Sequence, residues 1–213
     1  VELKRDATAE VVLNQLFRFT PMQTSFGCNM LALNGGRPEQ LTLRGFLSAF
    51  INFREDVVAR RTAYDLRKAR ERSHVLCGLA VAVSNVDEVV TTIRSSADAA
   101  EARAKLMTRA WNAQDILEYI ALIDDPTHTA NADGTYNLSE TQARAILDLR
   151  LQRLTQLGVK EVTDELQELA GKIKEYLAIL ASRERIMGII SDELREVKDQ
   201  FAVPRRTANV EWS

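Results

Sequence analysis

Few residues in this chain are grouped in a way that supports chemistry. His74 has no second histidine or carboxylate cluster at metal-ligand spacing, so a packing or hydrogen-bonding role is favoured for it. Cys28 and Cys77 form no CxxC pair and stand near no set of histidines, which favours free buried thiols. The sequence therefore predicts no catalytic residue and no metal site.

Two loops resemble ligand-binding loops only in composition. Gly35 and Gly36 lack the GxxxxGK[ST] and GxGxxG contexts of phosphate loops, and a proline follows two residues later. Because glycine accepts positive φ angles, the stretch Asn34-Gly35-Gly36-Arg37 predicts a β-hairpin instead. The acidic stretch 124–137 lacks the residue order of a calcium loop, so we expect a surface loop there and no cofactor in this chain.

A cluster of positive residues is the remaining candidate binding feature. The stretch 54–72 carries an excess of three positive charges, and its central members are Arg60, Arg61, Arg67 and Arg70. One interpretation is a solvated helix face with i,i+4 ion pairs. The other is a face along a passage that DNA traverses, where phosphates are attracted without base recognition. The sequence does not choose between them.

The element that carries this cluster is one very long helix over 43–84. The run has no proline, and its apolar or small residues recur at helical spacing. They are Leu47, Ile51, Val58, Thr62, Leu66, Ala69, Ser73, Leu76, Ala80 and Val83. At 1.5 Å per residue the helix spans roughly 63 Å. Its narrow stripe, with small members such as Ala69, requires a partner helix that approaches closely.

The partner comes later in the chain. Val162, Leu166, Leu169, Ile173, Tyr176 and Leu180 step by alternating fours and threes, which is a heptad-like seam. Ser182 can cap a second helix, so the return path is about as long as the outbound helix. We expect an antiparallel coiled coil whose seam includes Leu66, Ala69 and Leu76 on the outbound helix and Leu166, Leu169 and Ile173 on the return helix.

The residues between the two arms are expected to form a helical tip. Short amphipathic helices are predicted over 86–95, 97–108 and 112–123. Ser139 and Gln142 match a capping box that opens a helix over 139–155. This helix is rich enough in large aliphatic residues for two apolar faces, one of which can meet a second copy of the chain. We expect Leu138, Ile146, Leu149 and Arg150 at that dimer interface; the alternative is a helix wholly buried in the tip.

These elements define the expected fold class: mainly α, with a long antiparallel coiled-coil arm, a small helical tip domain and a small α/β base that carries a short hairpin. The base spans 1–42, with the end of a strand over 1–4 and a helix that begins at Asp6. The outbound arm is 43–84, the tip 85–158, the return arm 159–203 and the C-terminal tail 204–213.

Composition limits the classes of function. The formal net charge of −2 gives no global signature of nucleic-acid binding, although a local basic patch stays possible. No apolar run approaches the roughly 18 residues that a bilayer span needs, so no membrane partner is expected. The start at Val1 in place of methionine suggests an excised fragment.

Several segments together resemble one family. VELKRDA, TSFGCNMLALNGGRPE, FREDVVARRTAYDLRKARERSHVLCGLAVAVSNVDEVV, YNLSETQARAILDLRLQRLT and PRRT follow one another in this order over nearly all of 1–207. The ordered series is similar to the A subunit of bacterial DNA gyrase, a type IIA topoisomerase. The segment TSFGCNMLALNGG is more similar to gyrase than to the A subunit of topoisomerase IV, which remains the alternative.

The resemblance implies the end of the tower domain, the coiled-coil arm and the exit gate of an ATP-dependent enzyme that passes one DNA duplex through a transient break in another. It implies a homodimer through the tip, the B subunit of gyrase as the partner that carries ATP and Mg²⁺, transient contact with duplex DNA and a cytoplasmic location. The family's catalytic tyrosine has an R-Y-T context, which none of Tyr64, Tyr119, Tyr136 and Tyr176 has. The fragment alone is therefore expected to be inactive. A second, less favoured hypothesis is an autonomous coiled-coil scaffold unrelated to DNA.

Overall fold

The computed structural model describes residues 2–123, 128–149 and 159–207. These residues are mainly α-helical and form two small two-stranded sheets, which confirms the predicted fold class. The chain divides into two compact units, Val1–Asn52 and Phe53–Ser213, and the long helix α2 runs from the first into the second.

The first unit contains helix α1 (Ala9–Phe19) and the predicted hairpin. Strand β1 (Leu31–Asn34) pairs antiparallel with β2 (Arg37–Gln40). Gly35 and Gly36 have φ angles of 56° and 81°, and two successive positive φ angles are what a tight two-residue hairpin turn requires. The strand expected at the start of the chain is absent from Glu2–Lys4, because no other described segment pairs with it.

No described residue of this first unit is buried. Phe17 and Phe19 of α1 are 38% and 76% exposed, and Leu33 of the hairpin is 76% exposed. Cys28 is also exposed, so its expected burial is wrong: it precedes β1 in a segment that has no core to enter. The first unit therefore lacks a core of its own.

Helix α2 spans Leu43–Ser84, which are the bounds that the sequence predicted. It ends because Asn85 leaves the helical conformation and its side-chain amide donates to the carbonyl oxygens of Val81 (2.8 Å) and Asn112 (3.2 Å). Helix α3 (Val86–Arg94) then continues at 91° to α2. In the described part of the chain no single helix is long and apolar enough to cross a membrane, although α2 and α3 together meet the length and composition criteria.

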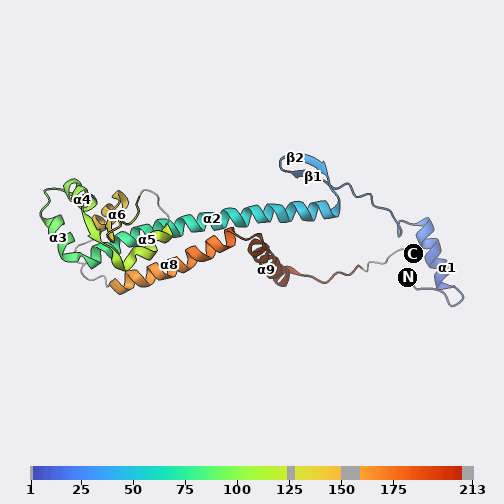
Figure 1. The fold of residues 1–213 in the computed structure, drawn as a ribbon. Helices are drawn as coiled ribbons and strands as arrows, with labels where there is room; N and C mark the ends of the chain where they lie inside the picture. The colour runs from blue at the N-terminus through green and yellow to red at the C-terminus, as the bar shows by residue number, and fades with distance from the viewer. Residues whose placement is uncertain (1, 124–127, 150–158, 208–213) are drawn as a thin grey trace. The chain divides into compact units, whose positions relative to one another are not determined.

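The tip gathers short elements around the end of α2 (Figure 1). In chain order they are α4 (Ala99–Thr108), β3 (Ala110–Asn112), the 3₁₀ turn η1 (Gln114–Ile116), α5 (Leu117–Ile123), β4 (Thr135–Asn137) and α6 (Glu140–Asp148). The three predicted helices of the tip before the loop correspond to α3, α4 and the pair formed by η1 and α5.

The sequence patterns did not reveal the pairing of β3 with β4. Trp111 lies opposite Tyr136 in the register, and each is only 1% exposed. A surface loop was therefore the wrong prediction for residues 135–137. Strands of three residues are too short to show alternation, and burial of two large aromatic side chains determines this pairing.

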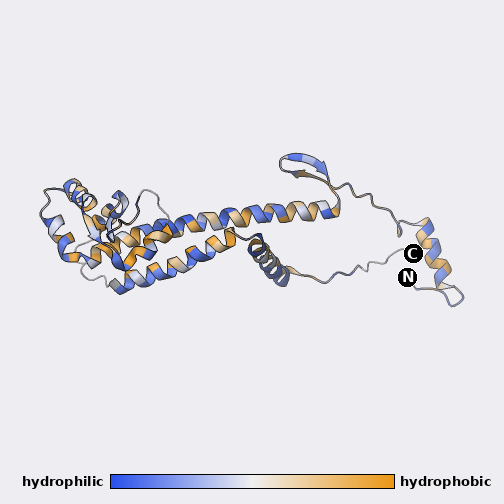
Figure 2. Ribbon diagram, in the orientation of Figure 1, coloured by the Kyte–Doolittle hydropathy of each residue, from blue (hydrophilic) through white to orange (hydrophobic). Residues whose placement is uncertain are grey.

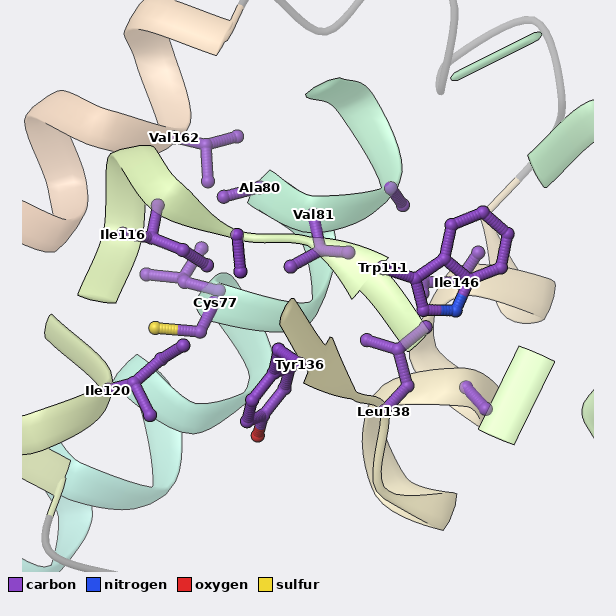
Figure 3. Packing of buried hydrophobic residues seen from close by; sticks show 14 of the residues in the cluster. Cys77, Ala80, Val81, Trp111, Ile116, Ile120, Tyr136, Leu138, Ile146 and Val162 are labelled. Carbon is purple, nitrogen blue, oxygen red and sulfur yellow. The ribbon is translucent and has the colours of Figure 1, made fainter. Parts of the chain in front are cut away.

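The tip has a continuous hydrophobic core. Figure 3 shows Cys77 and Val81 of α2 among Ile116, Ile120 and Tyr136 from other tip elements. Burial raises the pKa of the Cys77 thiol to about 12, so the group stays protonated and serves as a small apolar side chain. Its expected burial is confirmed.

Helix α6 begins as predicted and ends earlier. Ser139 and Gln142 form both hydrogen bonds of the capping box. The helix was expected to continue through 155, but Leu149 has extended dihedral angles and packs against the tip core, so α6 ends at Asp148. Tertiary packing overrides helix propensity at this point. The rest of the expected helix lies outside the described residues.

Two helices form the return path. Helix α8 (Val159–Leu180) lies beside α2, and Figure 2 shows its hydrophilic side turned away from α2. Helix α9 (Arg183–Phe201) begins at the predicted cap, where the Ser182 hydroxyl accepts from the Arg185 backbone N–H. The predicted break at Ser182 is thus confirmed.

The contact between α2 and α6 generates a prediction about Gly78. A Cβ atom at Gly78 would lie 2.6 Å from the Gln142 Cβ, and Gln142 is fully buried. We expect Gly78→Ala to lower the free energy of unfolding by about 1–3 kcal/mol, because α6 must move away from α2. Urea unfolding followed by circular dichroism measures this.

Gly171→Ala is the matched control, because a Cβ atom there meets nothing within 4 Å. It should stabilise α8 by about 0.5–1 kcal/mol through helix propensity. Equal unfolding midpoints for Gly78→Ala and the parent chain would show that α6 does not depend on this close approach.

Candidate functional site

The paired helices α2 and α8 make up the first part of the candidate site. Leu66 and Ala69 of α2 share a buried cluster with Ile173 of α8, and Leu169 packs against it. The Arg72 guanidinium donates to the Glu165 carboxylate at 2.8 and 3.1 Å. Residue numbers rise along α2 while those of their partners fall along α8, so the two helices are antiparallel.

The seam continues into the tip. Leu76 and Leu166 belong to the core cluster of the tip, and each is at most 2% exposed. Small buried residues of α2, among them Ala69, Ser73 and Ala80, let α8 and the tip elements approach its backbone closely. One continuous apolar surface thus joins the arm to the tip.

Helix α9 does not continue this side-by-side pairing but crosses α2. Val58 is fully buried against Ile186 and Ile190, which lie one turn apart on α9. The Glu193 carboxylate accepts from both Arg54 and Arg61 at 2.6 Å, and these two arginines lie two turns apart on α2. The antiparallel pairing expected for the whole return path therefore applies to α8, because the chain changes direction at Ser182.

A second ion pair fastens the start of α9. The Arg183 guanidinium donates to both carboxylate oxygens of Glu55, at 2.7 and 3.0 Å. Hydrogen bonds from Arg183 lower the pKa of Glu55, and those from Arg61 and then Arg54 lower the pKa of Glu193. Both carboxylates are therefore ionised wherever α9 is docked at neutral pH.

The four arginines of the predicted basic cluster have different surroundings. Arg61 is engaged with Glu193, while Arg60 Nε donates to the backbone oxygen of Asp56. The Arg67 guanidinium lies over the exposed Tyr64 ring, and Arg70 lines a groove beside the tip. The sequence alone could not show that Arg61 is ion-paired, because its carboxylate partner, Glu193, lies 132 residues away. Contact of this cluster with DNA stays a prediction.

Most of the residues predicted to form a dimer interface are buried within the tip of a single chain. Leu138 and Ile146 are 2% and 1% exposed and belong to the tip core, and Leu149 is half-buried against it. Arg150 lies outside the described residues. Leu138 and Ile146 thus have little surface to offer a second chain, and the interface stays a prediction that depends on Leu149 and its flanks.

His74 connects the arm to α6. Its Nε2 atom lies 2.7 Å from the Ser139 hydroxyl, and its backbone oxygen accepts a hydrogen bond from the Gln142 side chain at 2.7 Å. This confirms the predicted hydrogen-bonding role. The structure also brings the His128 ring to 5.7 Å from the His74 ring, edge to face, a proximity that the sequence alone does not reveal. Among described residues no three His, Cys, Asp or Glu side chains gather as metal ligands.

Three of the four tyrosines lie in or beside packed elements, whereas Tyr64 is exposed. Tyr136 is buried in the tip core and Tyr176 packs against the seam. Burial, followed by the nearby Glu118 carboxylate, raises the pKa of Tyr119.

The seam can be tested at Leu166, which is 1% exposed. Leu166→Ala should lower the free energy of unfolding by about 2–5 kcal/mol, because a cavity opens between α8 and α2. Leu177→Ala on the same helix is the control, since Leu177 is 38% exposed and its truncation should cost less than about 1 kcal/mol. Similar losses in both variants, measured by urea unfolding, would contradict the seam.

The crossing of α9 predicts a pH dependence. Glu193 has a lowered pKa in the folded chain, so its ion pairs stabilise the fold above its unfolded pKa near 4.5, and that stability is lost as pH falls through the folded pKa. Glu193→Gln should cost about 0.5–1 kcal/mol at pH 7, a small value because the pairs are partly solvent-screened.

In acid the Glu193→Gln variant and the parent should converge. Glu168→Gln, which breaks only an exposed pair with Lys172 within α8, is the control. A Glu193→Gln penalty that persists unchanged at low pH would show that the carboxylate charge is not what holds α9.

Known proteins are similar in sequence to this chain over nearly its whole length. A family model for the A subunit of DNA gyrase and topoisomerase IV matches residues 1–195. The chain is 50% identical over 207 residues to the A subunit of DNA gyrase from Granulibacter bethesdensis, a match that covers 97% of this chain and 22% of the relative.

Two further DNA gyrase A subunits match the chain over a similar length. The DNA gyrase A subunit of Rickettsia bellii is 47% identical over 208 residues, covering 98% of this chain and 23% of that protein. The Haemophilus influenzae protein of the same name is 45% identical over 212 residues, covering 97% and 24%. The chain thus spans less than a quarter of the length of these relatives. Its similarity over nearly all of its own length shows that the chain belongs to the family of DNA gyrase and topoisomerase IV A subunits.

Proposed function

We propose that this chain is the arm and exit-gate segment of a gyrase A subunit, within a type IIA topoisomerase that passes one DNA duplex through a transient break in another. The observation that carries the proposal is the antiparallel pair of α2 and α8, which leads into a tip with its own hydrophobic core. Its family membership supplies the context for that geometry.

A paired arm suits the transmission of movement over a distance. The 22 residues of α8 correspond to roughly 33 Å of helix paired with α2. Because buried side chains and the Arg72–Glu165 ion pair hold the helices together, the pair moves as one stiff element. Bending is then confined to positions where helices end, such as Asn85 and Ser182.

The tip is proposed to be the contact between two copies of the chain. A two-fold dimer uses the same surface on both protomers, so one small patch provides both sides of a closable joint. Leu149 is the favoured interface residue, since it lies half-buried at the end of α6. Contact limited to the tips leaves space between the arms for a duplex.

The first unit supports the proposal that the chain works inside a longer protein. None of its described residues is buried, and its α1 and hairpin expose large apolar side chains. Exposed apolar surface of this kind marks a docking face. We propose that the rest of the protein, more than three quarters of the length of the relatives, covers it.

DNA cleavage, ATP and Mg²⁺ are assigned by this proposal to other parts of the enzyme. The chain alone is proposed to be inactive, with the B subunit of gyrase as partner, duplex DNA as transient ligand and the cytoplasm as location. The A subunit of a topoisomerase IV is the second candidate, because the matching family description includes both. Family membership gives no support to an autonomous scaffold.

Sedimentation tests the tip contact in the 213-residue chain. We expect a homodimer of about twice the 23.9 kDa chain mass at about 100 µM, because association follows mass action. Leu149→Glu should shift the protein to a monomer with unchanged helical content, since it places a charge in an apolar contact.

Leu177→Glu is the control, because Leu177 is exposed on α8 and belongs to the arm. It should leave the dimer intact. A parent chain that sediments as a monomer throughout the concentration series would overturn the tip contact, whether or not the Leu149 variant folds.

A further inference from the structure

We propose that a groove between α2, the end of α5 and the start of α6 binds a small organic anion with an apolar body. The groove has a volume of about 740 Å³, within the range of small-molecule sites. It lies wholly in the second unit, on the arm side of the tip. The residues that carry the proposal are Leu66, Arg67, His74, Val75, Ile123 and His128.

Apolar side chains line part of the groove. Leu66 and Val75 come from α2, separated by more than two helical turns, and Ile123 comes from the last residue of α5. Leu66 is 8% exposed and Ile123 is 7% exposed, so each side chain is packed within the protein and only a small part of it faces the groove. Most of the other lining residues are polar or charged, so the groove combines apolar patches with groups that can orient an organic molecule.

The charges of the lining favour an anion. Glu71 is held by Lys68 at 2.9 Å, while Arg67 stands at 3.9 Å from it. Glu140 is held by Arg103 at 3.2 Å and Arg144 at 2.9 Å, and neither of these two arginines lines the groove. Because Lys68 holds Glu71 more closely than Arg67 does, the Arg67 guanidinium can exchange its long contact with Glu71 and its place over the Tyr64 ring for a ligand carboxylate.

The two histidines provide aromatic surface. Their rings meet edge to face with centroids 5.7 Å apart, and the Ser139 hydroxyl at 2.7 Å from Nε2 fixes the orientation of His74. Flat rings pack well against such aromatic pairs. We therefore assign the ligand class as aromatic carboxylates and related ring-bearing anions.

Such a ligand would join the arm to the tip. Its contacts on one side belong to α2, and on the other side to α5, His128 and α6. Occupancy would therefore stabilise the contact in which Gln142 and Ser139 dock against His74. Binding in the groove is independent of the proposed gate, because it depends only on residues of one chain.

The chain offers a specific reporter for the test, since its only two histidines both line the groove. The 213-residue protein with ¹³C-labelled imidazoles is titrated with 1-naphthoate and followed by NMR. We expect both imidazole signals to shift and saturate with a dissociation constant of about 1 mM or lower. Inorganic phosphate, which has charge alone, and 1-naphthalenemethanol, which has the apolar body alone, should bind at least about tenfold more weakly.

Two variants separate the groove from general surface binding. Arg67→Ala should weaken naphthoate binding about tenfold. Arg60→Ala removes the same charge from an exposed position of α2 outside the groove and should change it less than about twofold. Imidazole signals that do not respond to naphthoate, equal binding of the neutral alcohol, or equal effects of the two variants would each overturn the proposal.

Discussion

The structure depends on one constraint: a helix of 42 residues cannot bury its own apolar stripe. Successive parts of α2 are covered by different elements, and each contact fixes the position of its partner. Val58 packs against α9, Leu66 and Ala69 pack against α8, and Cys77 lies in the tip core. The arm and the tip are therefore not separate domains joined by a linker, because the same helix contributes to the core of both.

The contact between α2 and α6 shows how polar groups are used within this apolar setting. Gln142 is fully buried, an arrangement that costs free energy unless its amide is satisfied. Its oxygen accepts from the Ser139 backbone N–H, and its nitrogen donates to the His74 backbone oxygen. Gly78 provides the space, since any side chain there would overlap Gln142. A capping box, which is a local device, thus also attaches one helix to another.

Features with a local cause could be predicted from the sequence. The bounds of α2, the turn at Gly35 and Gly36, and the caps at Ser139 and Ser182 all follow from propensity, turn chemistry or capping. Features that depend on tertiary contact could not. The pairing of Trp111 with Tyr136 is invisible in three-residue strands, and Glu193 meets Arg61 only because α9 crosses α2.

The candidate site illustrates the same division. Periodicity identified Ile146 as part of an apolar helix face. It could not distinguish packing against a second chain from packing within the same chain, and the structure shows Ile146 in the core of its own tip. The same limit applies at the start of α2, where Leu47 and Phe50 are 57% and 47% exposed although they belong to a helix whose later residues are covered. An apolar stripe that extends past its partners needs a further partner. Since the chain spans less than a quarter of the length of its relatives, the remainder of such a protein is the partner that our proposal assigns to these residues.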